Sequence, residues 1–151
     1  MVTHSYYSGE TTEQTFSNWC KKNNIWRKKI RVPIDLDKTG INKANPQPCD
    51  FIVITKSETK WIEVKEIWDK PSFVKDRFHQ QYRLTELSNI GNSSKGYILL
   101  NFVGKNKLYY ISVIDYNVLD KLTGHKKSIN IKDIPKKFET TWENLYKVVN
   151  L

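Results

Sequence analysis

The sequence predicts an α/β fold in which a mixed β-sheet is flanked by helices. Segments with apolar residues at helical spacing alternate along the chain with short segments rich in β-branched and aromatic residues. The 151 residues contain no linker, repeat or low-complexity tract, and 38% of them are hydrophobic. We therefore expect a single folded domain over residues 1–151 that buries its own core.

The first segments predict a helix followed by an extended basic stretch. Thr11 is expected to be the N-cap of a helix that ends near Asn23, because a glutamine follows it at capping-box spacing and apolar residues recur on one face. Residues 25–34 are expected to be extended. Residues 39–48 contain turn formers and two prolines, and they predict a loop.

A β-hairpin is predicted next. Residues 50–55 are apolar and β-branched, and residues 61–65 alternate between apolar and polar side chains. Both patterns are typical of strands. The polar residues 56–60 between them predict the turn.

The second half of the chain predicts one long helix and two further strands. Residues 72–89 are expected to be helical, with Gly91 just past the end. Residues 96–102 and 108–113 are expected to be strands that are joined by a turn. Apolar residues at helical spacing over 142–149 predict a short closing helix.

The charge of the chain predicts a polyanionic partner. Lys and Arg number 25 against 16 Asp and Glu, which gives a net charge of +9. Residues 14–34 hold no acidic side chain but six basic ones, namely Lys21, Lys22, Arg27, Lys28, Lys29 and Arg31. Such a block favours binding to DNA phosphates, although a basic face that maintains solubility would have the same composition. Because most of the basic residues are lysine, recognition of backbone or shape is favoured over base reading.

Several classes of protein are disfavoured by the composition. No apolar run approaches the roughly 20 residues of a membrane span, and residues 1–7 lack the order of a secretion signal. Two cysteines and three scattered histidines predict neither a disulfide framework nor a zinc site. The sequence contains no Gly-rich phosphate-binding loop, so a nucleotide cofactor is not indicated. We expect an intracellular protein, cytoplasmic or nucleoid-associated, from a cell or a virus.

Three polar side chains of the predicted hairpin are candidates for catalysis. With the turn centred near Ser57, Asp50 lies opposite the segment from Glu63 to Lys65, and these two residues share a face of their strand. Two adjacent carboxylates repel unless a cation neutralises them, and Mg²⁺ prefers one or two carboxylates with water and phosphate oxygens. Such an ion polarises a phosphodiester and acidifies water, while Lys65 stabilises developing negative charge. The alternative is a solvent-facing strand in which Glu63 pairs with Lys65 or Lys60.

These residues resemble a known motif. Residues 48–50 (Pro-Cys-Asp) and 61–65 (Trp-Ile-Glu-Val-Lys) are similar to the core of the PD-(D/E)xK nuclease superfamily, with Pro-Cys-Asp in place of Pro-Asp. The chain is most similar there to the RecU-type and archaeal-type Holliday junction resolvases, through Gly-x-x-x-Glu at 9–13 and Phe-His-Gln-Gln at 78–81. The resemblance covers about residues 8–115 and implies a restriction-endonuclease-like core.

The resemblance also implies roles for the hairpin residues. Asp50, Glu63 and the backbone carbonyl of Val64 would bind Mg²⁺, for which Mn²⁺ would substitute. Lys65 would position or activate the attacking water.

Two helical residues would complete the site. Glu13 would act on the metal through water or a second ion, with Glu10 as the alternative. The competing interpretation of Glu13 is a first-turn carboxylate favoured by the helix dipole. Gln80 would hydrogen-bond near the lysine or the water, with Gln81 as the alternative, and an exposed helical glutamine is the competing interpretation.

Trp68 and His79 are further candidates for contacts with DNA. Trp68 follows the catalytic strand and could stack on a base, and His79 adjoins Gln80. The competing interpretations are core packing for Trp68 and a helix-surface position for His79.

Together these features predict a metal-dependent DNA endonuclease. The resemblance implies a homodimeric Holliday junction resolvase of DNA recombination or repair that cuts four-way junctions symmetrically. Residues 36–48 would be the segment that inserts at the junction centre in RecU-like relatives. The alternatives are a nicking, repair or restriction-like nuclease of the same fold, and a non-catalytic DNA-binding module.

Overall fold

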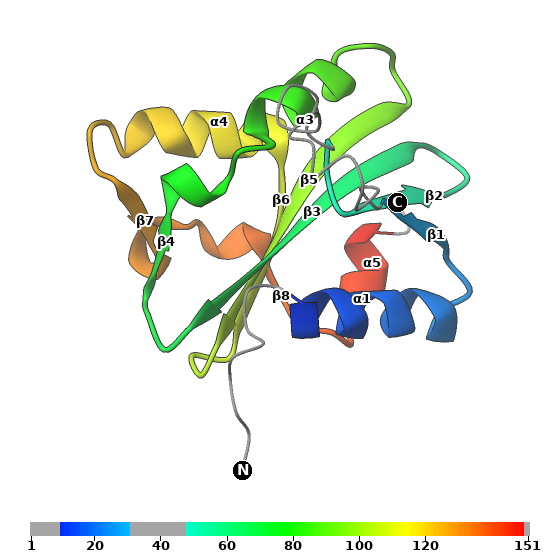
Figure 1. Ribbon diagram of the computed structural model, residues 1–151, viewed down its shortest axis with the longest axis horizontal. Helices are drawn as coiled ribbons and strands as arrows, with labels where there is room; N and C mark the ends of the chain where they lie inside the picture. Colours follow the sequence, from blue (N-terminus) through cyan, green and yellow to red (C-terminus); the bar gives the residue numbers. More distant parts are fainter. Residues whose placement is uncertain (1–9, 31–47, 150–151) are drawn as a thin grey trace, which may run out of the picture.

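A six-stranded mixed sheet separates two layers of helices in the computed structural model, which describes residues 10–30 and 48–149 (Figure 1). The strand order is β1-β2-β3-β5-β6-β8, and only β3 and β5 run parallel. The bounds are β1 Trp26–Lys29, β2 Phe51–Ile54, β3 Thr59–Trp68, β5 Ser94–Val103, β6 Lys107–Ser112 and β8 Glu139–Thr140.

Each face of the sheet has its own helices and its own core. Helices α1 (Glu10–Lys22) and α5 (Leu145–Val149) cover one face, and α3 (Gln81–Ser88) and α4 (Val113–Leu122) cover the other. A two-stranded sheet of β4 (Ser72–Val74) and β7 (Ser128–Asn130) extends the second layer, and the 3₁₀ turn η2 (Lys75–Arg77) follows β4. The 3₁₀ turns η3 (Ile131–Asp133) and η4 (Lys136–Phe138) lead to β8.

The hairpin of β2 and β3 has the predicted register. Phe51 lies opposite Ile62, and Ile54 lies opposite Thr59. β3 continues six residues beyond this pairing, and within the described chain residues 63–68 pair with β5 alone. Among the described residues the sheet therefore has an open edge where β2 ends, and the residues on either side of that edge form the site described below.

The prediction of one long helix over residues 72–89 is wrong. Residues 72–74 form β4, residues 75–77 form η2, and the helix α3 begins only at Gln81. Phe73 lies opposite Ile129 of β7, a strand more than 50 residues further along the chain. A β-branched or aromatic segment becomes a strand when such a partner exists, and local periodicity does not reveal the partner.

The other predicted elements are confirmed, with changes at their ends. Helix α1 begins at Glu10, one residue before the predicted cap at Thr11. The last predicted strand ends at Ser112, which caps α4 by accepting a hydrogen bond from the Asp115 N–H at 3.1 Å. Helix α4 had no counterpart among the predicted elements. The predicted loop 39–48 and the segment 36–48 that would insert at the junction centre lie outside the described residues except for Pro48, and so do residues 31–34 of the predicted extended stretch.

Helix α3 packs unusually close to the sheet. A Cβ atom on Gly96 of β5 would lie 2.9 Å from the Leu84 carbonyl oxygen, and the Gly96 N–H donates to the Ser88 hydroxyl at 2.7 Å. Only glycine allows this approach. The contact fixes the position of α3, and with it the position of Gln80 at the start of the helix. None of the described helices is long and apolar enough to span a membrane.

Candidate active site

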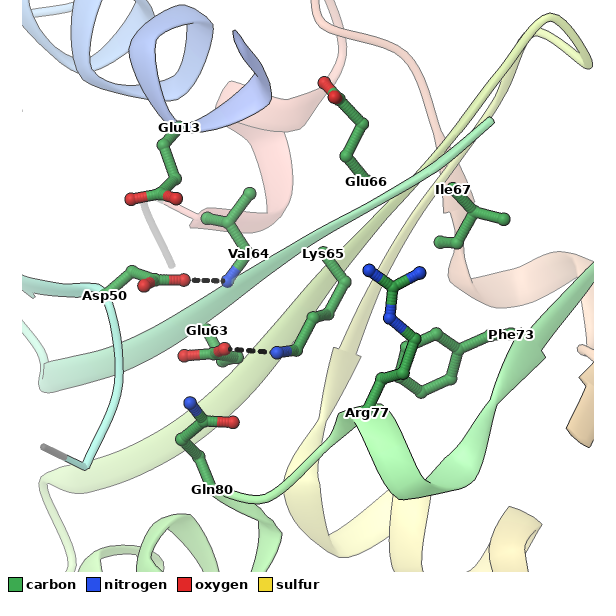
Figure 2. A pocket seen from close by; sticks show the side chains of 10 residues that line it. All are labelled: Glu13, Asp50, Glu63, Val64, Lys65, Glu66, Ile67, Phe73, Arg77 and Gln80. Atoms are coloured by element: carbon green, nitrogen blue, oxygen red, sulfur yellow. Dashed lines mark hydrogen bonds and ion pairs between the residues drawn. The ribbon is translucent and has the colours of Figure 1, made fainter. Parts of the chain in front are cut away.

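A cleft of about 200 Å³ opens at the free edge of β3. Figure 2 shows the side chains that line it, which come from α1, the start of β2, β3, β4 and the turn before α3. They are Glu13, Asp50, Glu63, Val64, Lys65, Glu66, Ile67, Phe73, Arg77 and Gln80. Every residue predicted for the catalytic and metal site therefore lines this one cleft.

Asp50 is fixed by the hairpin at the point where β2 begins. Its N–H donates to the Ile62 carbonyl at 3.1 Å, and its Oδ2 accepts from the Val64 N–H at 2.8 Å. The carboxylate thus replaces a strand partner for Val64 at the open edge (Figure 2). Burial raises the pKa of Asp50 above its ordinary value, although the hydrogen bond from Val64 opposes the shift.

Glu63 and Lys65 form an ion pair on one face of β3. The Lys65 Nζ lies 2.8 Å from Glu63 Oε2, and the side chain of Lys65 is partly exposed to the cleft. Glu63 is only 1% exposed, so the expected alternative of a solvent-facing strand is wrong, although its Glu63–Lys65 pairing is present. Burial and then the Asp50 carboxylate raise the pKa of Glu63 to about 8, against the opposing effect of Lys65.

The donor set of the cleft fits a hard divalent cation. Glu63 Oε1 and Gln80 Oε1 are buried oxygens without a hydrogen-bond partner among the described residues. The Val64 carbonyl points to the same side of β3 as its N–H, which faces Asp50. Within residues 10–30 and 48–149 no three carboxylate, imidazole or thiol side chains converge as a complete ligand set. Two carboxylates and a carbonyl leave positions for water and phosphate oxygens, as Mg²⁺ prefers.

Glu13 reaches the cleft from the opposite helix layer. The Thr12 hydroxyl donates to Glu66 of β3 and accepts from the Asn101 Nδ2 of β5 at 3.0 Å, which fixes this part of α1 to the sheet. Glu13 itself pairs with Lys29 of β1 at 3.2 Å. The side chain of Glu10, the predicted alternative, lies outside what the structure describes.

The two candidate glutamines point in different directions. Gln80 is half-buried and lines the cleft beneath Glu63 (Figure 2). Gln81 donates to Asn117 of α4 and lines a separate hollow between the two helices. Of the two alternatives, Gln80 is the one that lies in the cleft.

The residues predicted to bind DNA lie in different parts of the structure. Arg27 and Lys29 line a hollow of about 330 Å³ that shares Glu13 with the cleft. Lys21 and Lys22 at the end of α1 are exposed, and so is Lys28 on β1, whose side chain alternates with those of Arg27 and Lys29. His79 is exposed in the turn before α3. Trp68 is half-buried and donates its Nε1–H to Glu66 at 2.7 Å. Arg31 lies outside the described residues.

Two polar residues of the cleft were not among the predicted ones. Glu66 follows Lys65 directly, so strand alternation assigns it to the opposite face, and its bonds to Thr12 and Trp68 agree with that. Arg77 falls in the segment wrongly predicted as helix. No signal in the sequence distinguishes Arg77 from the other basic residues.

The two cysteines are buried free thiols. Burial raises the pKa of Cys20 to about 12 and that of Cys49, which adjoins Asp50, further still. A thiol with a raised pKa is a poor nucleophile. Neither thiol is therefore expected to act as a nucleophile, and neither lines the cleft.

The comparisons with known proteins bear on the fold. No family model and no curated protein matches the chain. Among solved structures, the chain is similar to Hjc, a Holliday junction resolvase from the archaeal hyperthermophile Archaeoglobus fulgidus, with a TM-score of 0.55 and 17% sequence identity. The match covers 91% of this chain and 98% of that chain. It confirms the predicted restriction-endonuclease-like fold, and the likeness to this archaeal resolvase is one of fold.

Proposed function

We propose that this chain is a metal-dependent DNA endonuclease that resolves four-way junctions as a homodimer. The observation that carries the proposal is the buried pair of carboxylates, Asp50 and Glu63, beside Lys65 in one cleft. Keeping two adjacent buried carboxylates ionised is unfavourable unless cations neutralise them. The likeness in fold to Hjc supports the choice of a junction as the substrate.

Five residues of the cleft have distinct tasks in this proposal. Asp50, Glu63 and the Val64 carbonyl would hold Mg²⁺ or Mn²⁺, and the bound cation supplies the positive charge that polarises the scissile phosphodiester. The Lys65 ammonium stabilises negative charge that develops on the phosphate oxygens. Gln80 Oε1 accepts a hydrogen bond from the attacking water, because this buried oxygen has no partner within the described chain.

The basic residues of α1 and β1 support binding to the DNA backbone. Arg27 and Lys29 lie in the hollow that adjoins the cleft at Glu13. A phosphate backbone that follows this hollow therefore leads toward the carboxylate pair. The net charge of +9 favours the association at low salt.

A cleavage assay tests the proposal. The purified protein is incubated with a labelled immobile four-way junction and with a linear duplex of matched sequence, each with Mg²⁺ and with a chelator. Symmetric, Mg²⁺-dependent cuts in the junction alone are the expected result. Cleavage of both substrates would instead indicate a nicking or repair nuclease, and tight binding without cleavage would indicate a DNA-binding module. Light scattering of the free protein tests the homodimer.

A further inference from the structure

We propose that Arg77 is a positioning residue that binds the phosphate next to the scissile one on the DNA strand being cut. The inference rests on the proposed function, and it adds a residue that the motif does not include. Arg77 lies in η2, at the end of the cleft beyond Lys65, and its guanidinium points toward the cleft (Figure 2).

The guanidinium of Arg77 makes no hydrogen bond or ion pair with any residue that the structure describes, although acidic side chains line the same cleft. Those acids already have partners: Glu13 pairs with Lys29, Glu63 pairs with Lys65, and Glu66 accepts hydrogen bonds from Thr12 and Trp68. Asp50 accepts from the Val64 N–H. The positive charge of Arg77 is therefore not needed to neutralise an acidic side chain of the cleft, and it remains available for an anion that enters the cleft.

The turn that carries Arg77 is held firmly by its neighbours. On either side of it, Phe73 and Phe78 are buried and both pack edge-on against Tyr116, with ring centroids 6.4 and 4.9 Å away. The Lys75 Nζ contacts Asp120 Oδ1 at 3.1 Å, and the Lys75 N–H donates to the Lys127 carbonyl at 3.0 Å. Because the backbone of Arg77 is already ordered, binding an anion restricts only its side chain.

The order of charges along the cleft indicates which anion. In Figure 2 the carboxylates of Asp50 and Glu63 are followed by Lys65 and then by Arg77. A strand whose scissile phosphate faces the carboxylate pair would bring its next phosphate toward Arg77. The planar guanidinium can donate two parallel hydrogen bonds to a phosphate, and it fixes orientation in a way that an ammonium does not.

Substitutions at Arg77 separate the effect of its positive charge from the effect of its planar guanidinium. We expect Arg77→Ala to lower the single-turnover cleavage rate of the junction about 10- to 100-fold, the range for loss of a charged hydrogen bond. It should also reduce the slope of log affinity against log salt by about one phosphate contact, measured in chelator. Arg77→Lys keeps the charge, so the salt slope should remain while the cleavage rate falls. The matched control is Arg83→Ala, because Arg83 pairs with Glu86 on α3 at 3.7 Å.

Neutral phosphates locate the contact. Single methylphosphonates are placed around the cleavage site of the junction. At the phosphate next to the scissile one, the substitution should slow the wild type but cause no further loss in Arg77→Ala. Equal losses in both proteins at every position would overturn the inference while leaving the nuclease proposal intact.

The binding measurement keeps the two proposals distinguishable. If the wild type binds the junction but does not cut it, the nuclease proposal fails, and a reduced salt slope for Arg77→Ala still supports a phosphate contact. Affinity and slope equal to those of the wild type overturn the inference whether or not the wild type cuts. Circular dichroism and thermal unfolding of each variant exclude loss of the fold.

Discussion

Replacing Glu63 by glutamine should stabilise the protein in chelator, and the gain should grow as the pH rises. Glu63 is buried against Asp50, and its pKa is raised from 4.5 to about 8. A folded-state pKa above the unfolded value means that folding favours the protonated form. The stability from this group is fully present below about pH 4.5 and is lost as the pH rises through 8. Glutamine does not titrate, so the variant avoids this loss.

The size of the effect follows from the shift. Between the unfolded pKa of 4.5 and the folded pKa of about 8, each pH unit removes about 1.4 kcal/mol of stability from the wild type. This amounts to about 3 kcal/mol between pH 5 and 7. The amide oxygen of glutamine can still accept a hydrogen bond from Lys65, and a less favourable geometry of this bond costs up to about 1 kcal/mol. We expect a net gain of about 2 kcal/mol at pH 7, or a rise in Tm of about 4–8 °C for a chain of this length.

Thermal unfolding of both proteins in chelator at pH 5, 6, 7 and 8 measures the difference. Glu58→Gln on the same hairpin is the matched control. Burial alone would raise the pKa of Glu58, but hydrogen bonds from Lys60 and Tyr97, at 2.8 and 2.6 Å, lower it. Its contribution is present above the unfolded pKa and is lost as the pH falls, so this variant should be destabilised at neutral pH and less so in acid. A difference between Glu63→Gln and wild type that is constant from pH 5 to 8 would refute the reasoning.

The remaining predictions concern the metal, the catalytic residues, the DNA surface and the fold. Mg²⁺ should raise the Tm of the wild type more at pH 8 than at pH 6, because protons compete for the carboxylates; equal shifts would contradict this. Asp50→Asn and Lys65→Ala should each abolish cleavage and retain junction binding in gel-shift titrations, and a variant that cuts at the wild-type rate would disprove its residue's role. Replacing Lys28 and Lys29 by glutamine should reduce the salt slope of binding by about two contacts, and an unchanged slope would place the DNA elsewhere. Gly96→Ala should destabilise the protein by about 1–3 kcal/mol in urea unfolding. An unchanged free energy of unfolding would show that α3 can move away from the sheet without loss of stability.

The hairpin was predictable because its determinants are local. Alternation assigns Glu63 and Lys65 to one face, and the short polar turn then sets the register that places Asp50 beside them. These constraints involve residues within one segment of 16 residues, from Asp50 to Lys65.

The parts that could not be predicted depend on contacts between distant segments. Phe73 forms a strand because β7 exists, and this pairing removes the first half of the expected helix. The start of α3 decides that Gln80, and not Gln81, lines the cleft. Glu13 reaches the cleft because Thr12 bonds to residues of β3 and β5. The pairing of Phe73 with Ile129 and the bonds of Thr12 join segments more than 50 residues apart, and the start of α3 depends on its packing against Gly96 of the next strand. No local pattern reveals these contacts.

The edge of β3 that no described strand pairs with has a consequence for solubility. Unpaired N–H and C=O groups along a strand edge are a template on which another chain can add a strand and start aggregation. The Asp50 carboxylate occupies the Val64 N–H at this edge, and Lys65 adds a charge that opposes strand addition. Asp50→Asn retains an oxygen acceptor for Val64, whereas Asp50→Ala leaves the N–H free. An inactive protein for co-crystallisation with uncut DNA is therefore better made with asparagine than with alanine.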